Sequence, residues 1–262
     1  MNPEEMVNLE KHSRDPAKFL GYISQEFGNR AVFTSSFGAE DMVMMNLIKK
    51  HGNRIEIASI DTGRLPEETY QIMDTVRNGY GISFRTFFPD KEEVQKMVDE
   101  YGLNLFYKSR ENRALCCNVR KVEPLRRILK NHEIWITGIR REQTIFRSGS
   151  KLVEYDKEKD IVKVNPIIEW KSDQVWDYIK QNNVPYNKLH DLGYPSIGCE
   201  PCTRAVRQGD DQRSGRWWWE DGQKECGLHT EGSEKLLSTP DFIRISGKRE
   251  KGSNNGGNDN VF

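Results

Sequence analysis

The sequence predicts an α/β protein built on a doubly wound, mostly parallel β-sheet. Short β-prone segments alternate with helix-like segments through the first half of the chain, a pattern that places helices on both faces of a parallel sheet. Strands are expected at residues 31–37, 54–60, 82–88 and 133–137. Polar motifs follow three of these strands, and ligands in such sheets bind outside the carboxyl ends of the strands. The sequence therefore predicts a ligand site at that edge of the sheet.

Helix-forming patterns connect the strands. Pro66 is followed by two acidic residues, a combination that suits the first turn of a helix. Asp90 is expected to cap a helix that starts at Lys91, and Ser172 is expected to cap one that runs to Gln181. Further helices are expected at 8–27 and 40–50, and a β-hairpin at 151–168.

Length and composition indicate an ordinary globular protein. The 262 residues suffice for a single domain, expected at residues 1–240, and include 40 basic and 40 acidic side chains. A net charge of zero disfavours a nucleic-acid partner. No apolar run could cross a bilayer and the N-terminus lacks a signal core, so we expect a cytoplasmic protein without a membrane partner. Residues 241–262 are polar and are expected to form a disordered tail.

Four of the five cysteines form two pairs. Cys116 and Cys117 are adjacent, and Cys199 and Cys202 form a C-x-x-C. In a reducing compartment such clusters are more often metal ligands than disulfides. Four thiolates suit zinc or an iron–sulfur cluster, but adjacent helical side chains diverge by about 100°. This divergence favours a 4Fe–4S cluster, with zinc and four unlinked buried thiols as alternatives.

The fifth cysteine, Cys226, stands apart from the other four. It lies in a polar segment with His229 nearby. A neighbouring imidazolium lowers the pKa of a thiol and favours the nucleophilic thiolate. The alternative is an inert buried cysteine, which is the commoner fate of a lone thiol.

Two features predict an anion site. Residues 35–41 (SSFGAED) link a strand to a helix, and Ser35, Ser36 and Gly38 offer hydroxyl groups and close backbone approach at the helix N-terminus. An ordinary strand-to-helix turn is the alternative. Arginines also cluster after the fourth strand and after the C-x-x-C, which favours a ligand with several phosphate or sulfate oxygens over solvated surface charge. These basic side chains are Arg120, Lys121, Arg140, Arg141, Arg147, Arg204, Arg207, Arg213 and Arg216.

Together these motifs resemble those of the assimilatory adenylyl-sulfate reductases, the iron–sulfur branch of the phosphoadenylyl-sulfate reductase family. The resemblance spans roughly residues 20–235 and rests on residues 35–41, 60–68, 116–125, 198–204, 213–220 and 225–230. It implies a Rossmann-like PP-loop fold of the adenine nucleotide α-hydrolase type. It also implies one 4Fe–4S cluster per subunit on the four paired cysteines. The sequence is compatible with a homo-oligomer but does not predict the oligomeric state.

The implied reaction reduces adenosine 5′-phosphosulfate to sulfite and AMP. In it the Cys226 thiolate takes the sulfonate, and thioredoxin or glutaredoxin then releases sulfite. A mobile lid at residues 205–235 would carry Cys226. By resemblance Lys121, Arg147, Arg213 and Arg216 contact the phosphosulfate, with Arg147 chosen over Arg140 and Arg141. Ser35, Ser36 and Gly38 would hold the phosphate side, and Asp61, Thr62 and Gly63 the nucleoside side.

Three rival functions remain at this point. The nearest is a reductase of 3′-phosphoadenosine 5′-phosphosulfate, or one that accepts both nucleotides. A PP-loop ATP pyrophosphatase that thiolates tRNA would typically carry Ser-Gly-Gly-x-Asp-Ser, which residues 35–41 do not match. A zinc-structured nucleotide-binding protein without activity would be colourless, whereas an iron–sulfur protein is brown.

Overall fold

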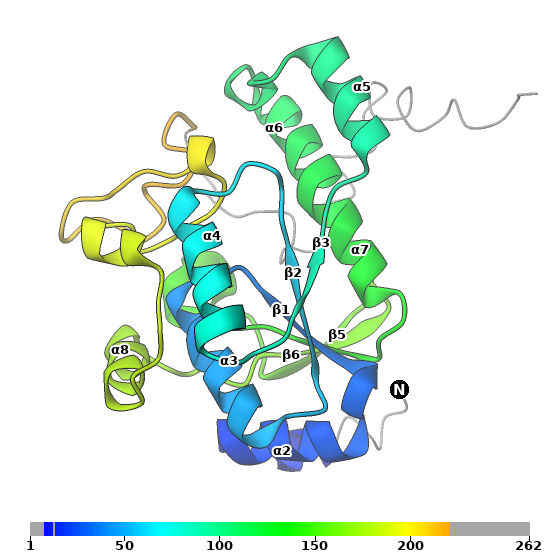
Figure 1. The fold of residues 1–262 in the computed structure, drawn as a ribbon, viewed down its shortest axis with the longest axis vertical. Coiled ribbons are helices and arrows are strands. Elements are labelled where there is room, and N and C mark those ends of the chain that lie inside the picture. Colours follow the sequence, from blue (N-terminus) through cyan, green and yellow to red (C-terminus); the bar gives the residue numbers. More distant parts are fainter. Residues whose placement is uncertain (1–7, 13, 221–262) are drawn as a thin grey trace, which may run out of the picture.

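The computed structural model describes residues 8–12 and 14–220, and its centre is a six-stranded sheet of order β3-β2-β1-β4-β6-β5 (Figure 1). Each neighbouring pair is parallel except β5 and β6, which are antiparallel. The mostly parallel α/β sheet predicted from the sequence is confirmed. The strands are β1 (Ala31–Ser35), β2 (Glu56–Ile60), β3 (Arg85–Phe87), β4 (Ile134–Ile136), β5 (Val153–Asp156) and β6 (Ile161–Val164).

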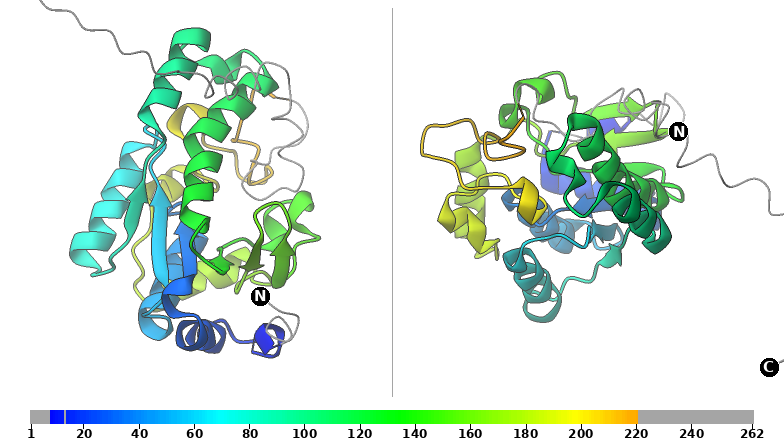
Figure 2. Two further views of the ribbon diagram at one scale, coloured as in Figure 1. Left: turned by 90° about the vertical axis from the view of Figure 1, so that its right-hand side faces the viewer. Right: turned by 90° about the horizontal axis from the view of Figure 1, so that it is seen from above.

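Helices cover both faces of this sheet (Figures 1 and 2). The larger apolar cluster joins one face to α2, α3, α4 and α8, and a smaller one joins the other face to α7. The helices are α2 (Pro16–Glu26), α3 (Ala39–His51), α4 (Glu67–Asp74), α5 (Lys91–Tyr101), α6 (Arg110–Cys117), α7 (Glu123–Leu129) and α8 (Ser172–Gln181). None of these described helices combines the length and apolarity needed to cross a membrane.

The chain order creates a switch point in the sheet. From β1 the chain moves outward through β2 to β3, then returns to add β4 on the other side of β1. Loops at such a point diverge and leave a crevice beyond the carboxyl ends of the strands. In Figure 1, α5 and α6 and the segment that includes η7 (Lys188–Leu192) and η8 (Glu200–Cys202) extend past that edge.

Local structure differs from the sequence prediction in three respects. Lys171 is the N-cap of α8 in place of Ser172, which is the first helical residue, because the Lys171 N–H donates to the Gln174 side chain. The predicted hairpin forms, but its second strand also joins β4 and so extends the main sheet. Helices α6 and α7 were not predicted, because cysteines and basic residues interrupt their apolar pattern.

Candidate functional site

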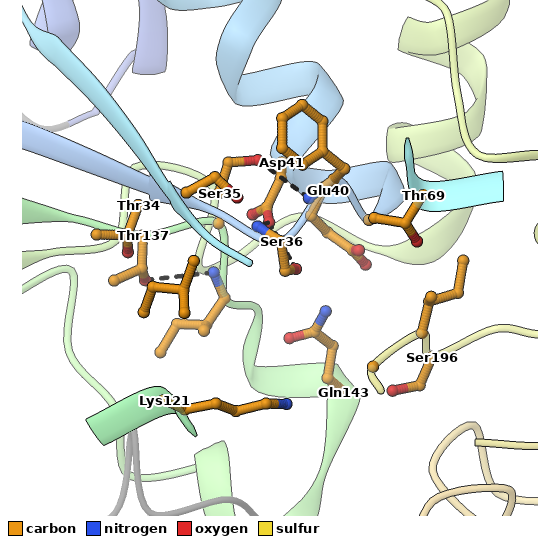
Figure 3. A pocket seen from close by; sticks show the side chains of 18 of the residues that line it. Thr34, Ser35, Ser36, Glu40, Asp41, Thr69, Lys121, Thr137, Gln143 and Ser196 are labelled. Carbon is orange, nitrogen blue, oxygen red and sulfur yellow. Dashed lines mark hydrogen bonds between the residues drawn. The ribbon is translucent and has the colours of Figure 1, made fainter. Parts of the chain in front are cut away.

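A cavity of about 200 Å³ lies at the carboxyl ends of β1, β2 and β4 (Figure 3). It is lined by the loops that follow these strands, by the turn after α6 and by residues 190–216. Eight of the ten predicted substrate-binding residues line it, namely Ser35, Ser36, Gly38, Thr62, Lys121, Arg147, Arg213 and Arg216. The cavity thus joins segments more than 180 positions apart in the chain, from Thr34 to Arg216.

The loop after β1 forms one wall. Ser35 Oγ accepts a hydrogen bond of 3.0 Å from the Phe37 N–H, and Phe37 adopts the left-handed region at φ 59°. This turn directs Gly38 to the N-cap of α3, where it supplies no side chain to the first-turn N–H groups. Those groups and the helix dipole favour an anion at this end of α3.

Asp41, which the sequence analysis did not single out, fixes this loop. Its carboxylate accepts hydrogen bonds from the Ser36 N–H at 2.6 Å and the Ser36 hydroxyl at 2.8 Å (Figure 3). Burial raises the pKa of Asp41 to about 6, although the two bonds from Ser36 oppose the rise. Gly138 makes room for the carboxylate, since a Cβ there would lie 2.5 Å from Asp41 Oδ1.

The three predicted residues in the loop after β2 have two different roles. Asp61 Oδ1 accepts hydrogen bonds from the Gly63 N–H at 2.7 Å and the Tyr70 hydroxyl at 2.9 Å, and Gly63 has φ 69°. Among the residues that the structure describes, Asp61 and Gly63 do not line the cavity, whereas Thr62 does. Asp61 therefore shapes the turn that presents Thr62.

Four cations also line the cavity and are called its cationic wall: Lys121, Arg147, Arg213 and Arg216. The last two approach Ser196 Oγ, each at 3.4 Å. Gly198 allows the Arg216 position, because a Cβ at Gly198 would lie 2.2 Å from an Arg216 terminal nitrogen. A dianion or trianion in the cavity would meet several fixed positive charges at once.

The neighbouring arginines take structural roles. Arg140 is almost fully buried and pairs with the Glu40 carboxylate at 2.8 Å. Arg141 pairs with Glu169 and donates to the Ser150 carbonyl. Of the three candidates after the fourth strand, Arg147 is the one that lines the cavity.

A second, smaller cavity of about 20 Å³ adjoins the first and is lined by all four paired cysteines. Cys116 and Cys117 end α6, and a π-helical turn (Asn118–Val122) follows them. Cys199 and Cys202 bracket a 3₁₀ turn in which the Cys202 N–H donates to the Cys199 carbonyl at 3.0 Å. No disulfide joins any two of these four cysteines, and within residues 8–12 and 14–220 no three ligating side chains converge closely enough to hold a metal ion.

Lys121 and Arg216 line both cavities and connect them electrostatically. Burial raises the pKa of Cys116 and of Cys202 to about 12. Burial also acts to raise the pKa of Cys199, but Lys121, the Thr62 hydroxyl at 3.2 Å and Arg216 outweigh it and lower that pKa. The cationic wall therefore stabilises a thiolate in the second cavity as well as an anion in the first.

The predicted nucleophile Cys226 lies outside the described residues, as does the part of the proposed lid from residue 221 to residue 235. The described chain ends at Glu220, whose carboxylate pairs with Arg113 at 2.6 Å and is 3.7 Å from Arg110. This anchor holds the end of the described chain beside the cysteine cavity, because Trp217 lines that cavity. Cys226 follows Glu220 by six positions in the sequence.

Several lining residues escaped the sequence analysis. They are Thr34, Ser59, Thr69, Trp135, Gln143, His190 and Ser196. Polar residues at strand ends could have identified Thr34 and Ser59. The others lie in segments whose place beside the cavity depends on the folded chain.

Comparison with known proteins places this geometry in a family. A family profile described as phosphoadenosine phosphosulfate reductase domain matches residues 30–205. The chain belongs to this family. Curated relatives named adenosine 5′-phosphosulfate reductase share 44% identity over 84% of this chain and 85% of theirs (Agrobacterium fabrum), and 49% over 77% and 81% (Burkholderia cepacia).

Solved structures show how this family's fold relates to others. The phosphoadenylyl-sulfate reductase of Candida auris matches with a TM-score of 0.65 and 28% identity, covering 79% of this chain and 98% of that one. The FMN adenylyltransferase of Candida glabrata matches with a TM-score of 0.53 and 12% identity, covering 95% and 86%. The second likeness concerns the fold alone.

Proposed function

We propose that the chain is an adenylyl-sulfate reductase that converts adenosine 5′-phosphosulfate to sulfite and AMP in assimilatory sulfate reduction. The cavity carries the proposal: a helix N-terminus and four cations line one space beside a four-cysteine cavity. Relatives that share 44–49% identity over most of the chain bear the name of this activity. A thioredoxin-type dithiol is the proposed reductant.

In the first step the Cys226 thiolate attacks the sulfate sulfur. A sulfur–sulfur bond forms, the bond between sulfur and the bridging phosphate oxygen breaks, and AMP leaves with the bonding electron pair. Lys121, Arg147, Arg213 and Arg216 would neutralise charge on the phosphosulfate oxygens as it shifts to the leaving phosphate. The N-terminus of α3 and Ser36 would hold the nucleotide in line for attack.

In the second step a thiolate of the reductant attacks the Cys226 sulfur. The sulfur–sulfur bond breaks and its electron pair leaves with sulfite, so sulfur gains two electrons. The second thiol of the reductant then attacks the mixed disulfide, which regenerates the Cys226 thiolate and leaves the reductant as a disulfide. One dithiol is consumed for each sulfite.

The four paired cysteines are the proposed ligands of one 4Fe–4S cluster per subunit. They fit in their chemistry, because the four thiol side chains line one cavity, with two cations beside them that favour a thiolate at Cys199. When bound, the cluster would add a fixed charge distribution next to Lys121 and Arg216. Neither proposed step requires an electron from it.

The second candidate substrate is 3′-phosphoadenosine 5′-phosphosulfate. The Candida auris structure is named for that activity at 28% identity. The Glu40 and Asp41 side chains line the cavity and would repel an additional phosphate, so we favour the unphosphorylated nucleotide. Measured kcat/KM should be higher for adenosine 5′-phosphosulfate than for its 3′-phosphorylated form.

Mass spectrometry tests the central claim. The full chain, loaded with its cluster, is mixed with adenosine 5′-phosphosulfate without reductant and then digested. We expect a sulfonate adduct on the Cys226 peptide that is absent in Cys226→Ser and disappears when a dithiol is added. Turnover by cluster-loaded protein without any adduct would contradict the proposed intermediate.

A further inference from the structure

One lobe of the large cavity differs in chemistry from the rest. Ile60, Leu125 and Trp135 line it, on the face of the sheet that α7 covers. The same cavity is lined by four cations, Arg147, Arg213, Arg216 and Lys121, the last of which stands four positions before Leu125. A nucleoside phosphosulfate has one apolar aromatic end and one anionic end, so the base matches the apolar lobe and the phosphosulfate matches the cations.

Thr34 is the polar side chain within this lobe. Residues alternate between the faces of β1, so Thr34 lies on the same face as Val32, which belongs to the apolar cluster with Leu125 and Trp135. Thr34 is the last residue of β1 on that face, and it lines the cavity (Figure 3). A hydroxyl in an apolar lobe is costly to bury unless both its donor and its acceptor capacity are used.

Trp135 uses the acceptor capacity of that hydroxyl. Its indole Nε1–H donates to Thr34 Oγ1 at 2.8 Å, and Trp135 is 1% exposed. The ammonium groups of Lys159 and Lys163 lie 5.6 and 5.4 Å from the centre of its ring. Packing and these two cations hold the indole, and with it the direction of its N–H.

The hydroxyl hydrogen of Thr34 must therefore point away from the indole. An indole N–H is a donor only, so it cannot accept that hydrogen. Within the described part of the chain, no group accepts a hydrogen bond from Thr34 Oγ1, while the cavity lies beside it. We propose that Trp135 is a positioning residue that orients the Thr34 hydroxyl as a donor to an unprotonated ring nitrogen of the substrate's purine base.

This inference rests on the proposed function, and AMP is the probe that separates the two. Isothermal titration calorimetry measures the affinity of AMP for the full-length, cluster-loaded protein. Ribose 5-phosphate is the matched control ligand, because it lacks the base. Thr34→Val removes the hydroxyl at nearly constant shape, and Thr34→Ser keeps it. We expect Thr34→Val to weaken AMP binding about tenfold, Thr34→Ser to restore most of it, and ribose 5-phosphate to bind all three proteins equally.

Trp135→Phe tests the positioning role. It removes the N–H and keeps an aromatic ring, so it should weaken AMP binding about threefold in the wild-type background by freeing the hydroxyl to rotate. In the Thr34→Val background it should cause no further loss, because the group on which it acts is gone. An equal loss in both backgrounds would show that Trp135 does not act through Thr34 and would overturn the proposal.

The base itself supplies a second readout. AMP analogues in which one ring nitrogen is replaced by carbon identify the contacted atom. We expect one of them to bind wild type more weakly than AMP does. Thr34→Val should not weaken the binding of that analogue further. Equal sensitivity of every analogue to Thr34→Val, or unchanged AMP binding in that variant, would contradict a contact with the base. Failure of the wild-type protein to bind AMP at all would contradict the proposed function instead. Melting temperatures of the variants confirm that each is folded.

Discussion

The loop after β1 and the cationic wall line one cavity, but they are assembled in different ways. The loop is organised by partners a few residues away: Ser35 holds Phe37, and Asp41 holds Ser36. The wall combines Lys121 with Arg147, Arg213 and Arg216, which come from two further segments. A local turn is encoded by neighbouring residues, whereas the wall exists only when distant segments pack together.

The two sides also differ in how their charges are controlled. On the loop side, burial raises the pKa of the Asp41 carboxyl group to about 6. On the wall, Lys121 and Arg216 face both the anion cavity and the cysteine cavity. Changes on the wall should therefore affect catalysis most, and changes in the loop should appear mainly in stability.

The largest effect is expected from Lys121→Ala. Removing a charge that faces the transferring group should lower kcat/KM for adenosine 5′-phosphosulfate by about 10²- to 10³-fold, the range for losing one preorganised electrostatic contact. Visible absorption of the cluster should stay unchanged, because Lys121 is not a proposed ligand. Lys18→Ala, on the exposed surface of α2, is the control and should retain activity. Loss of the cluster with unchanged substrate affinity would contradict the role assigned to Lys121.

A smaller effect is expected from Gly198→Ala, which displaces a charge without removing it. The added Cβ would lie 2.2 Å from the Arg216 guanidinium, the flexible end of that side chain, so the fold should persist while the guanidinium moves. We expect kcat/KM to fall about tenfold, with a melting temperature close to that of wild type. Gly149→Ala is the matched control, because no atom lies within 4 Å of its added Cβ. Equal activity of the two variants would show that the position of Arg216 does not matter.

The smallest effect on activity, and a distinct effect on stability, is expected from Asp41→Asn. Burial raises the pKa of Asp41 from 3.8 to about 6, so folding favours the protonated form, and stability is lost as pH rises from about 4 to about 6. Asparagine does not titrate there. The unfolding free energy of wild type relative to Asp41→Asn should therefore fall by about 2 kcal/mol between pH 4 and pH 7.

Chemical denaturation at a series of pH values measures that difference. Asp177→Asn, an exposed change on α8, should show no such dependence on pH. A difference between wild type and Asp41→Asn that is constant or rises with pH would show that Asp41 is not buried as an acid. Local contacts would then not control the charge of the loop after β1.

The sequence predicted the sheet well because strand ends in a parallel sheet share one edge. The loop at Ser35 and Gly38 and the turn at Thr62 were found as motifs that follow strands. Asp61 and Gly63 share that turn, but the direction of a side chain depends on its hydrogen bonds, and theirs hold the turn itself. Adjacent motif residues can therefore have different tasks that spacing alone does not separate.

Residues with no motif could not be assigned in advance. Trp135 looks like an ordinary core residue of β4, but in the folded chain it lines the cavity and donates a hydrogen bond to Thr34 on the neighbouring strand β1. Ser196 and His190 enter the cavity because residues 188–202 fold over the carboxyl edge (Figure 1). Such contacts depend on the path of an irregular segment, which local propensity does not fix.

The sequence by itself determined the alternation of strands and helices, the grouping of the cysteines and the supply of basic residues near them. These follow from short-range patterns and from residue chemistry. Tertiary structure alone decided that Arg147 enters the cavity while Arg140 pairs with Glu40, and that Lys121 and Arg216 border both cavities. The physical reason is that a charge interacts through space with whatever the fold brings near it, and long side chains from distant segments meet only after the sheet has formed.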